Sequence, residues 1–173
     1  METKYGKYIV QDIYMKEERD PDLPKMPKFT TGPSIMVHEG GLGADCSIAY
    51  HCVTSPIDMP TPPHSHDCHQ FLCFFGGDPK NTKDFGAEIE ICLGEEYEKH
   101  YIDQSTIVSI PPNLLHCPLN FKKVDKPIIF MEITLEREYT KVVSKDTIDK
   151  LPPEMVKDLS PEGLKKRGMK IKE

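Results

Sequence analysis

Three histidines, a cysteine, an aspartate and a glutamine lie within the ten residues PPHSHDCHQF, positions 62–71. Imidazoles, thiolates and carboxylates are the groups that bind transition metals, and a histidine beside a cysteine can also activate a thiol nucleophile. The stretch therefore allows three interpretations: one side of a metal site, a reactive Cys/His pair, or a polar loop rich in histidine.

His64 and His66 have the spacing that a metal site in an extended segment requires. Side chains of a strand share a face at every second residue, and Gln70 has the same parity. A second stretch, IPPNLLHCPLN, supplies His116. Its Pro-Pro-Asn run predicts a turn in which Asn113 takes the left-handed conformation, which would bring His116 back toward the sheet. Three imidazoles and one amide oxygen make a four-ligand site with room for water or substrate.

The other histidines lack this support. His69 is out of phase with His66, so we expect it at the surface or behind the ligands. His38, His51 and His100 have no informative spacing, and we expect ordinary core or surface roles for them.

The first stretch resembles the first motif of the cupin superfamily, G(X)5HXH(X)3–4E(X)6G. His64 and His66 stand at its two histidines, Gln70 stands at its glutamate, and Gly77 stands at its last glycine. Asp58 replaces its first glycine. Because these glycines serve turns that Asp or Asn also tolerates, the departure leaves the fold prediction intact.

The second stretch resembles the second cupin motif, G(X)5PXG(X)2H(X)3N. Pro111, His116 and Asn120 match it, whereas Ser105 and Asn113 replace its glycines. The resemblance covers residues 34–136 and implies one small antiparallel β-barrel of the double-stranded β-helix or jelly-roll type. It also implies a metal-binding protein and, through the pairing habits of cupins, a homodimer.

The resemblance and the spacing together predict the metal ligands His64, His66, Gln70 and His116. With glutamine at the glutamate position all four ligands are neutral, so a divalent metal keeps its full charge. We expect a stronger Lewis acid and a less accessible trivalent state. Such a site suits one divalent transition metal: Fe, Mn, Zn, Ni or Cu.

Three further residues are expected beside the ligands without binding the metal themselves. Asp67 adjoins His66 and would restore a negative charge near the site, Cys68 shares the parity of His66, and Asn120 belongs to the second motif.

The thiol interpretation depends on Cys68 and Cys117, which both lie next to predicted ligands. Sequence adjacency does not hold a base against a thiol, because neighbours in a strand point to opposite faces. The chain has six cysteines and no CxxC pair. We therefore expect reduced, buried, unreactive thiols, although Cys68 can approach the pocket.

Two residues are candidates for catalysis, Tyr50 and Glu132. In CSIAYHCV one face carries Tyr50 and the other carries His51, and the sequence leaves open which face points inward. Glu132 lies among apolar residues in IIFMEITL. It is either a general base or a solvent-facing residue of an edge strand.

Short segments rich in β-branched and aromatic residues predict an all-β fold. They are SIMVHEG, CSIAYHCV, HQFLCFF, GAEIEICLG, EEYEKHYI, STIVSIPP and PIIFMEITL. We expect an N-terminal strand and a proline-rich arm in residues 1–33, the barrel in 34–136, and a tail in 137–173. In the tail, LPPEMVKDL and SPEGLKKRG predict short helices.

The chain has 173 residues, which fits one domain, and a net charge of −6. The negative charge argues against nucleic acid and against an anionic membrane surface. No apolar run approaches the roughly 20 residues that span a bilayer, and the N-terminus lacks the apolar core of a signal peptide. We therefore expect a cytoplasmic protein.

These observations predict a small metalloenzyme of dioxygenase, isomerase or lyase type that acts on a small, metal-chelating organic anion. The alternatives are a non-catalytic module that binds a small molecule or a structural metal, and a barrel without metal. A catalytic site keeps an exchangeable coordination position, whereas a structural site is closed.

Overall fold

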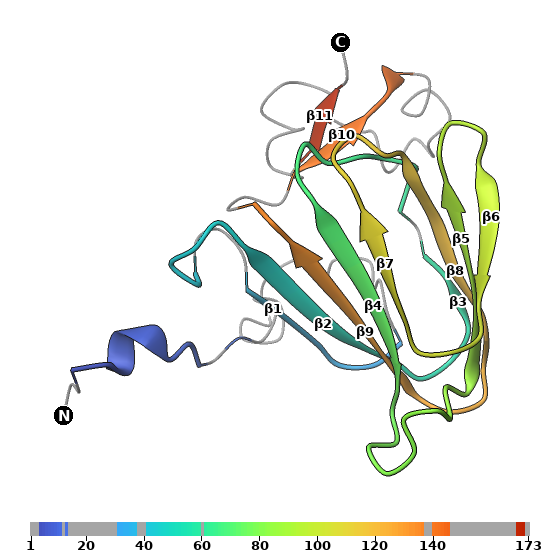
Figure 1. Ribbon diagram of the computed structural model, residues 1–173, viewed down its shortest axis with the longest axis horizontal. Helices are drawn as coiled ribbons and strands as arrows, with labels where there is room; N and C mark the ends of the chain where they lie inside the picture. The colour runs from blue at the N-terminus through green and yellow to red at the C-terminus, as the bar shows by residue number, and fades with distance from the viewer. Residues whose placement is uncertain are drawn as a thin grey trace, which may run out of the picture.

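The computed structural model describes residues 4–11, 13, 31–37, 41–59, 61–136, 140–145 and 169–171. Its body consists of two antiparallel sheets (Figure 1). The larger sheet has the order β1-β2-β9-β4-β7. Its strands are β1 (Ser34–Val37), β2 (Ser47–Val53), β9 (Ile128–Thr134), β4 (Gln70–Gly76) and β7 (Thr106–Ile110).

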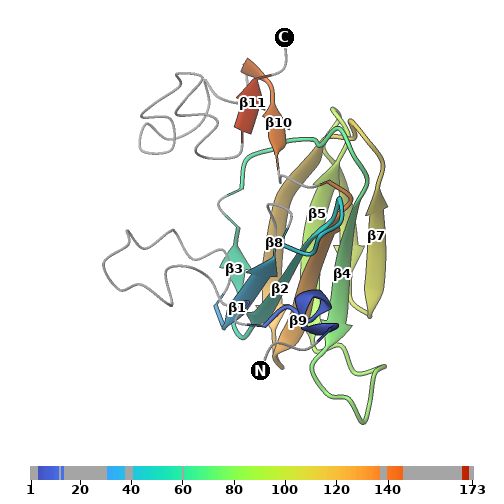
Figure 2. The same cartoon turned by 90° about the vertical axis from the view of Figure 1, so that its left-hand side faces the viewer.

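The smaller sheet has the order β3-β8-β5-β6. Its strands are β3 (Ile57–Asp58), β8 (His116–Val124), β5 (Ala87–Leu93) and β6 (Glu98–Ile102). A separate parallel pair, β10 (Lys141–Val143) and β11 (Met169–Ile171), lies beyond one end of the two sheets, at the top of both Figure 1 and Figure 2. The N-terminal part contains one short 3-10 helix, η1 (Gly6–Tyr8).

The core lies between the inner faces of the two sheets. In β2 every second residue is buried, including Ala49, His51 and Val53, as the pleat of a half-buried strand requires. Phe74 and Phe130 stack within the larger sheet with ring centroids 5.1 Å apart. Phe121 of the smaller sheet packs against Phe130 at 5.7 Å. This aromatic contact joins the two sheets.

The all-β, antiparallel prediction for residues 34–136 is confirmed, but the prediction of a closed barrel is wrong. Among the described strands, no ladder joins the larger sheet to the smaller one. One reason is that β3 has only two residues, too few for a second ladder beyond its pairing with β8. The molecule is therefore a pair of packed sheets with open edges at β1, β7, β3 and β6.

The predictions for the two ends of the chain can be compared with the structure only where residues there are described. Residues 4–11 contain η1 and no strand, and the carbonyl of Ile13 accepts a hydrogen bond from the amide of Met36 in β1. Of the proline-rich segment only residues 31–33 are described, and the carbonyl of Pro33 accepts from the amide of Cys52 over 2.9 Å. The two predicted C-terminal helices lie outside the described residues. Within the part of the chain that is described, no helix is long and apolar enough to cross a bilayer.

Candidate metal centre

The segment that carries His64 and His66 is tied by its backbone to two other parts of the chain. The amide of His64 donates to the carbonyl of His116 over 3.1 Å, and the amide of His116 donates back over 2.9 Å. Ser65 makes the equivalent pair with Val142 of β10, at 2.9 and 2.7 Å. The segment is therefore fixed between β8 and β10, and both histidines are positioned by backbone pairing.

The turn that precedes β8 completes this arrangement. Asn113 has a φ of 66°, so the predicted left-handed conformation is confirmed. Its amide donates to the carbonyl of His66 over 2.7 Å. The Pro-Pro-Asn turn thus fixes the backbone on both sides of the site, and His116 begins β8 directly after it.

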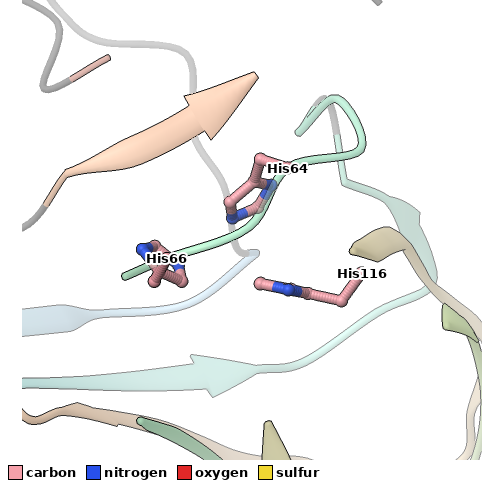
Figure 3. Close-up of side chains that lie close together, drawn as sticks. All are labelled: His64, His66 and His116. Carbon is pink, nitrogen blue, oxygen red and sulfur yellow. The ribbon is translucent and has the colours of Figure 1, made fainter. Parts of the chain in front are cut away.

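The imidazoles of His64, His66 and His116 converge on one point (Figure 3). Each offers a ring nitrogen, and these nitrogens all lie within 4.8 Å of one another. The ring centroids are 4.3 to 5.3 Å apart. All three residues are at most 2% exposed. Buried imidazoles at this separation make the kind of three-nitrogen face that a transition metal can bind.

Backbone carbonyls select the tautomer of all three rings. The Nδ1 groups of His64, His66 and His116 lie 2.7, 2.7 and 3.0 Å from the carbonyl oxygens of Pro62, Thr140 and Leu114. Because a carbonyl can only accept, each Nδ1 carries the proton and donates. Each neutral ring therefore keeps its lone pair on Nε2, the atom that a metal would take.

The environment also keeps these rings neutral. Burial lowers the pKa of His64 well below its usual value, and the positive charge of Lys141 and the neighbouring rings add to this. Burial likewise lowers the pKa of His66, and it lowers the pKa of His116 to about 4. At neutral pH the three imidazoles are therefore neutral, with one proton on Nδ1, which is the state that binds metal.

Gln70 occupies the first residue of β4 and is fully buried. Its Nε2 donates to the hydroxyl of Thr134 over 3.3 Å, which leaves Oε1 as the free end of the amide. Neither Gln70 Oε1 nor His116 Nε2 has a hydrogen-bond partner among the described residues, although both are buried. Two buried acceptors without a donor are costly unless a cation satisfies them, so the residues present fit a metal ion.

An acidic group that the sequence did not reveal lies behind His66. The side chain of Glu136 is 15% exposed, and its Oε1 lies 3.8 Å from His66 Nδ1. The same oxygen accepts the amide of Thr140 over 2.8 Å, and the Thr140 carbonyl accepts from His66. Glu136 thereby holds the residue that orients His66. Its distance of 70 positions from His66 hides this relation from sequence spacing.

Asp67, Cys68 and Glu136 form a second group whose ligand atoms lie within 4.8 Å of one another. The side chain of Asp67 is 61% exposed and lies 4.0 Å from Lys170 of β11. Asp67 therefore acts electrostatically on His66 from a position largely in solvent.

The thiols next to the ligands are protonated at neutral pH. Burial raises the pKa of Cys117 to about 12. Burial, together with the charges of Glu136 and Asp67, raises the pKa of Cys68 to about 11. All six cysteines are free. A thiol with a raised pKa is a poor nucleophile, so the geometry does not favour a reactive Cys/His pair.

The structure separates the two candidates for catalysis. Tyr50 lies on the outer face of β2, because its neighbours His51 and Ala49 are the buried ones. Glu132 lies on the inner face of β9, opposite Ala49 and Leu72. Since β9 lies between β2 and β4, the alternative that places Glu132 on an edge strand is wrong.

Asn120, the third residue expected beside the ligands, lies in β8 opposite Glu90. Opposed residues of antiparallel strands share a face, and Glu90 forms an ion pair with Lys99 at 3.2 Å. Its neighbours Leu119 and Phe121 supply the buried face. Asn120 therefore lies on the other face of the smaller sheet from the core.

The remaining histidines are also accounted for. His69 is exposed and its ring stacks on Phe71, which agrees with its expected place outside the ligand set. His100 lies on β6, 3.2 Å from Glu98. His51 is buried on the inner face. His38 lies outside the described residues.

Lys141 of β10 is the positive charge of this region. It acts electrostatically on all three histidines and on Glu132. Burial lowers its own pKa, and the negative charge of Glu132 partly offsets this effect. Neither composition nor spacing singled out this lysine, because it stands in a tail that reads as solvent-exposed.

Comparison with known proteins gives similarities at low sequence identity only. No model of a known protein family matches the sequence, and no curated protein matches it. A polyketide cyclase from Streptomyces resistomycificus is 14% identical over 59% of this chain and 63% of its own, with a TM-score of 0.41. The chain thus spans less than two thirds of that protein.

Two further matches are a protein described as a cupin and an enzyme. An RmlC-like cupin family protein with a double-stranded β-helix fold, from Methanocaldococcus jannaschii, is 15% identical over 75% of this chain and 94% of its own, with a TM-score of 0.43. A variant of Bacillus subtilis oxalate decarboxylase is 15% identical over 76% of this chain and 34% of its own, with a TM-score of 0.46.

At TM-scores below 0.5 these similarities say nothing about the residues or the chemistry of the site. The grounds for a metal centre are the converging imidazoles and the two motifs that carry them. The chain is similar to cupin proteins in these motifs and, at low identity, in structure.

Proposed function

We propose that this chain binds one divalent transition metal through His64, His66, His116 and Gln70, and that it is a small metalloenzyme acting on a small organic anion that chelates the metal. The observation that carries the proposal is the convergence of three buried imidazoles, each of which donates a hydrogen bond from Nδ1 to a backbone carbonyl oxygen. A histidine cluster that served packing alone would not need the same tautomer three times.

The charges around the site support an anionic ligand. All four proposed protein ligands are neutral, so a divalent metal would keep its full charge and act as a Lewis acid toward an anionic oxygen. The ammonium group of Lys141 adds positive potential to the same region. Together they favour a carboxylate or a similar small anion over a neutral or cationic ligand.

Metal content tests the proposal directly. We expect untagged protein to contain close to one metal per chain by inductively coupled plasma mass spectrometry. His66→Ala and His116→Ala should each lose it, because each removes one of three converging nitrogens. His69→Ala is the matched control, since its exposed imidazole belongs to the same segment without facing the site.

Folding of each variant is checked by circular dichroism, so that loss of metal is not confused with loss of structure. A wild-type protein that contains no metal and takes up none of Fe, Mn, Zn, Ni or Cu would contradict the proposal.

The rival function is a non-catalytic module in which the metal or a small molecule is bound without reaction. The two are distinguished by the open coordination position. In the cobalt(II) form, azide or acetate should change the visible absorption spectrum of an enzyme-type site, because the anion enters the ligand sphere. An unchanged spectrum at saturating anion would favour a closed, structural metal.

A further inference from the structure

A row of hydrogen-bonded polar side chains crosses the inner face of the larger sheet beside the metal centre. Ser34 of β1 lies directly opposite His51 of β2, and its Oγ is 2.8 Å from His51 Nδ1. On the other side of the ring, His51 Nε2 is 3.4 Å from Glu132 Oε2 on β9. The three residues thus form a continuous Ser–His–Glu chain across three neighbouring strands.

Contacts with Ser34, Glu132 and Phe130 fix the position of the His51 ring. It is 4% exposed, and its ring stacks on Phe130 with centroids 5.6 Å apart and planes 27° from parallel. The contact with the Glu132 carboxylate requires a proton on Nε2, so neutral His51 accepts the Ser34 hydroxyl at Nδ1. All the hydrogen bonds therefore point toward Glu132 and favour its ionised form.

The electrostatics of Glu132 agree with this geometry. Burial by itself would raise the pKa of its carboxyl group. The hydrogen bond from His51 and the electrostatic effects of His51 and Lys141 together outweigh burial and leave the pKa below its usual value.

Glu132 also lies at the right depth to serve the metal centre. Gln70 opposes Thr134 in the ladder between β4 and β9, and Leu72 opposes Glu132. Glu132 is therefore one pleat below the Gln70–Thr134 pair on the same inner face, at a diagonal spacing of about 7–8 Å. Its side chain is 20% exposed although β9 is an inner strand, so water reaches it.

We propose that Glu132 is the proton acceptor of this site: it takes the proton that an acidic ligand loses when its oxygen binds the metal, and His51, held by Ser34, positions it for this. The inference rests on the proposed metal-binding function. The step is a simple transfer in which the O–H bond of the ligand breaks and an O–H bond forms on the Glu132 carboxylate. No other reactant is needed.

Several charged or titratable groups surround Glu132 and compete for this role. They are His51 on β2, Lys141 on β10, His116 and Cys117 on β8, and His66. Neither neighbour on β8 can act as the proton acceptor. The thiol of Cys117 holds its own proton, and the imidazole of His116 would be occupied by the metal. Lys141 as an ammonium ion already carries its proton, so the solvent is the competitor that the test has to separate from Glu132.

The test follows the rate at which a known acidic chelator binds, because a carboxylate with a lowered pKa accepts a proton in passing and returns it to water. Cobalt(II)-loaded protein is mixed with acetohydroxamic acid at neutral pH and low buffer concentration, and the change in visible absorption gives the association rate. If Glu132 takes the ligand's proton, Glu132→Gln, which keeps shape and removes the base, should slow association by about 100-fold. Acetate, which has no proton to lose at this pH, should bind the variant at least as fast as wild type.

A second variant tests the positioning role of His51. His51→Phe keeps a ring against Phe130 but removes the hydrogen bond to Glu132. The pKa of Glu132 should then rise, so that the carboxyl is already protonated at a higher pH. As the pH is lowered, the association rate of acetohydroxamic acid should therefore begin to fall at a higher pH than in wild type, whereas His51→Gln, which retains an N–H donor, should shift this point less.

The outcomes separate this inference from the proposed function. Equal association rates of acetohydroxamic acid for wild type and Glu132→Gln overturn the inference, and they point to the solvent as the acceptor. If Glu132→Gln does not fold, a wild-type rate that rises in proportion to buffer concentration overturns it just as well, because the buffer is then the base. A wild type that binds no cobalt(II) contradicts the proposed function itself.

Discussion

Gln70 is the residue that most sets the chemical character of this site. A glutamate there would bring one negative charge to the metal, whereas the amide brings none. The structure adds that the amide has a direction, because its nitrogen is committed to Thr134 and its oxygen is left for a cation. The residue is thus a neutral ligand candidate whose orientation is already set.

Replacing Gln70 with glutamate tests this view. We expect metal affinity to rise by about tenfold or more, equivalent to at least about 1.4 kcal/mol, because a carboxylate attracts a divalent ion more strongly than an amide does. In iron-loaded protein the midpoint potential should fall, since the added charge stabilises the trivalent state. Chelator competition and redox titration measure the two effects.

Asn120→Asp is the matched control, because it makes the same amide-to-carboxylate change on the face of β8 that points away from the core. Its metal affinity should equal that of wild type. Equal affinities for wild type and Gln70→Glu would remove Gln70 from the ligand set.

The lowered pKa values of the histidines predict how the stability of the metal-free protein depends on pH. In the unfolded chain an imidazole titrates near 6.5, whereas folded His116 titrates at about 4. Between these values the unfolded state binds more protons. The stabilisation is therefore complete above the unfolded pKa and is lost as pH falls from about 6.5 toward 4, by up to about 3 kcal/mol for this residue.

Urea unfolding of metal-free protein at pH 7, 6 and 5 measures this effect. We expect the midpoint to fall with pH, and His116→Asn should show a shallower fall than wild type. His69→Ala should keep the wild-type slope, because its exposed ring is not part of the buried cluster. An equally steep fall in His116→Asn would show that burial of this ring does not govern acid stability.

At the scale of the elements, the strands that carry clear alternation could be predicted from the sequence. β2, β5, β7 and β9 fall within predicted segments, and β4 extends one residue beyond its predicted segment, to Gly76. β8 was missed as a strand, because Pro118 cannot donate to a ladder and the Pro-Pro-Asn turn dominates the stretch before it. The convergence of His64, His66 and His116 agrees with their spacing, which needs no knowledge of the strand.

The parallel pair β10–β11 could not be predicted, since three-residue strands carry no periodicity and pairing between residues 141–143 and 169–171 leaves no local signal. The missed residues Glu136, Thr134 and Lys141 share this cause. They come to the site only through the long-range pairing of β9 with β4 and of β10 with the His64–His66 segment.

The role of β10 leads to a prediction. The amide of Val142 donates to the carbonyl of Ser65 over 2.7 Å, so it fixes the residue between two proposed ligands. Val142→Pro removes this donor, and we expect metal affinity to fall by about 10–100-fold, the usual effect of losing a group that orients a ligand.

Val142→Ala keeps the amide and is the control for lost side-chain packing. Chelator competition on both variants gives the comparison. Indistinguishable affinities for the proline and alanine variants would mean that β10 covers the site without orienting it.

At the scale of the whole molecule, two sheets joined by Phe74, Phe121 and Phe130 carry the candidate metal centre. The all-β fold class could be predicted from the strand signals in the sequence. Whether the two sheets close into a barrel could not be predicted, because closure depends on pairing between edge strands that no single segment encodes.

The homodimer implied by the resemblance to cupins stays a prediction. Sedimentation equilibrium should give about twice the chain mass of 19.7 kDa. A single-chain mass that persists at high concentration would contradict it.

The links between His66 and Thr140, and between Ser65 and Val142, also have a consequence for biosynthesis. A chain still emerging from the ribosome exposes His64, His66 and His116 before residues 140–142 leave the exit tunnel. Until then the carbonyl of Thr140 does not yet accept from His66 Nδ1, and Val142 does not yet pair with Ser65. We therefore expect metal loading to follow the emergence of residues 140–142 rather than that of the three histidines.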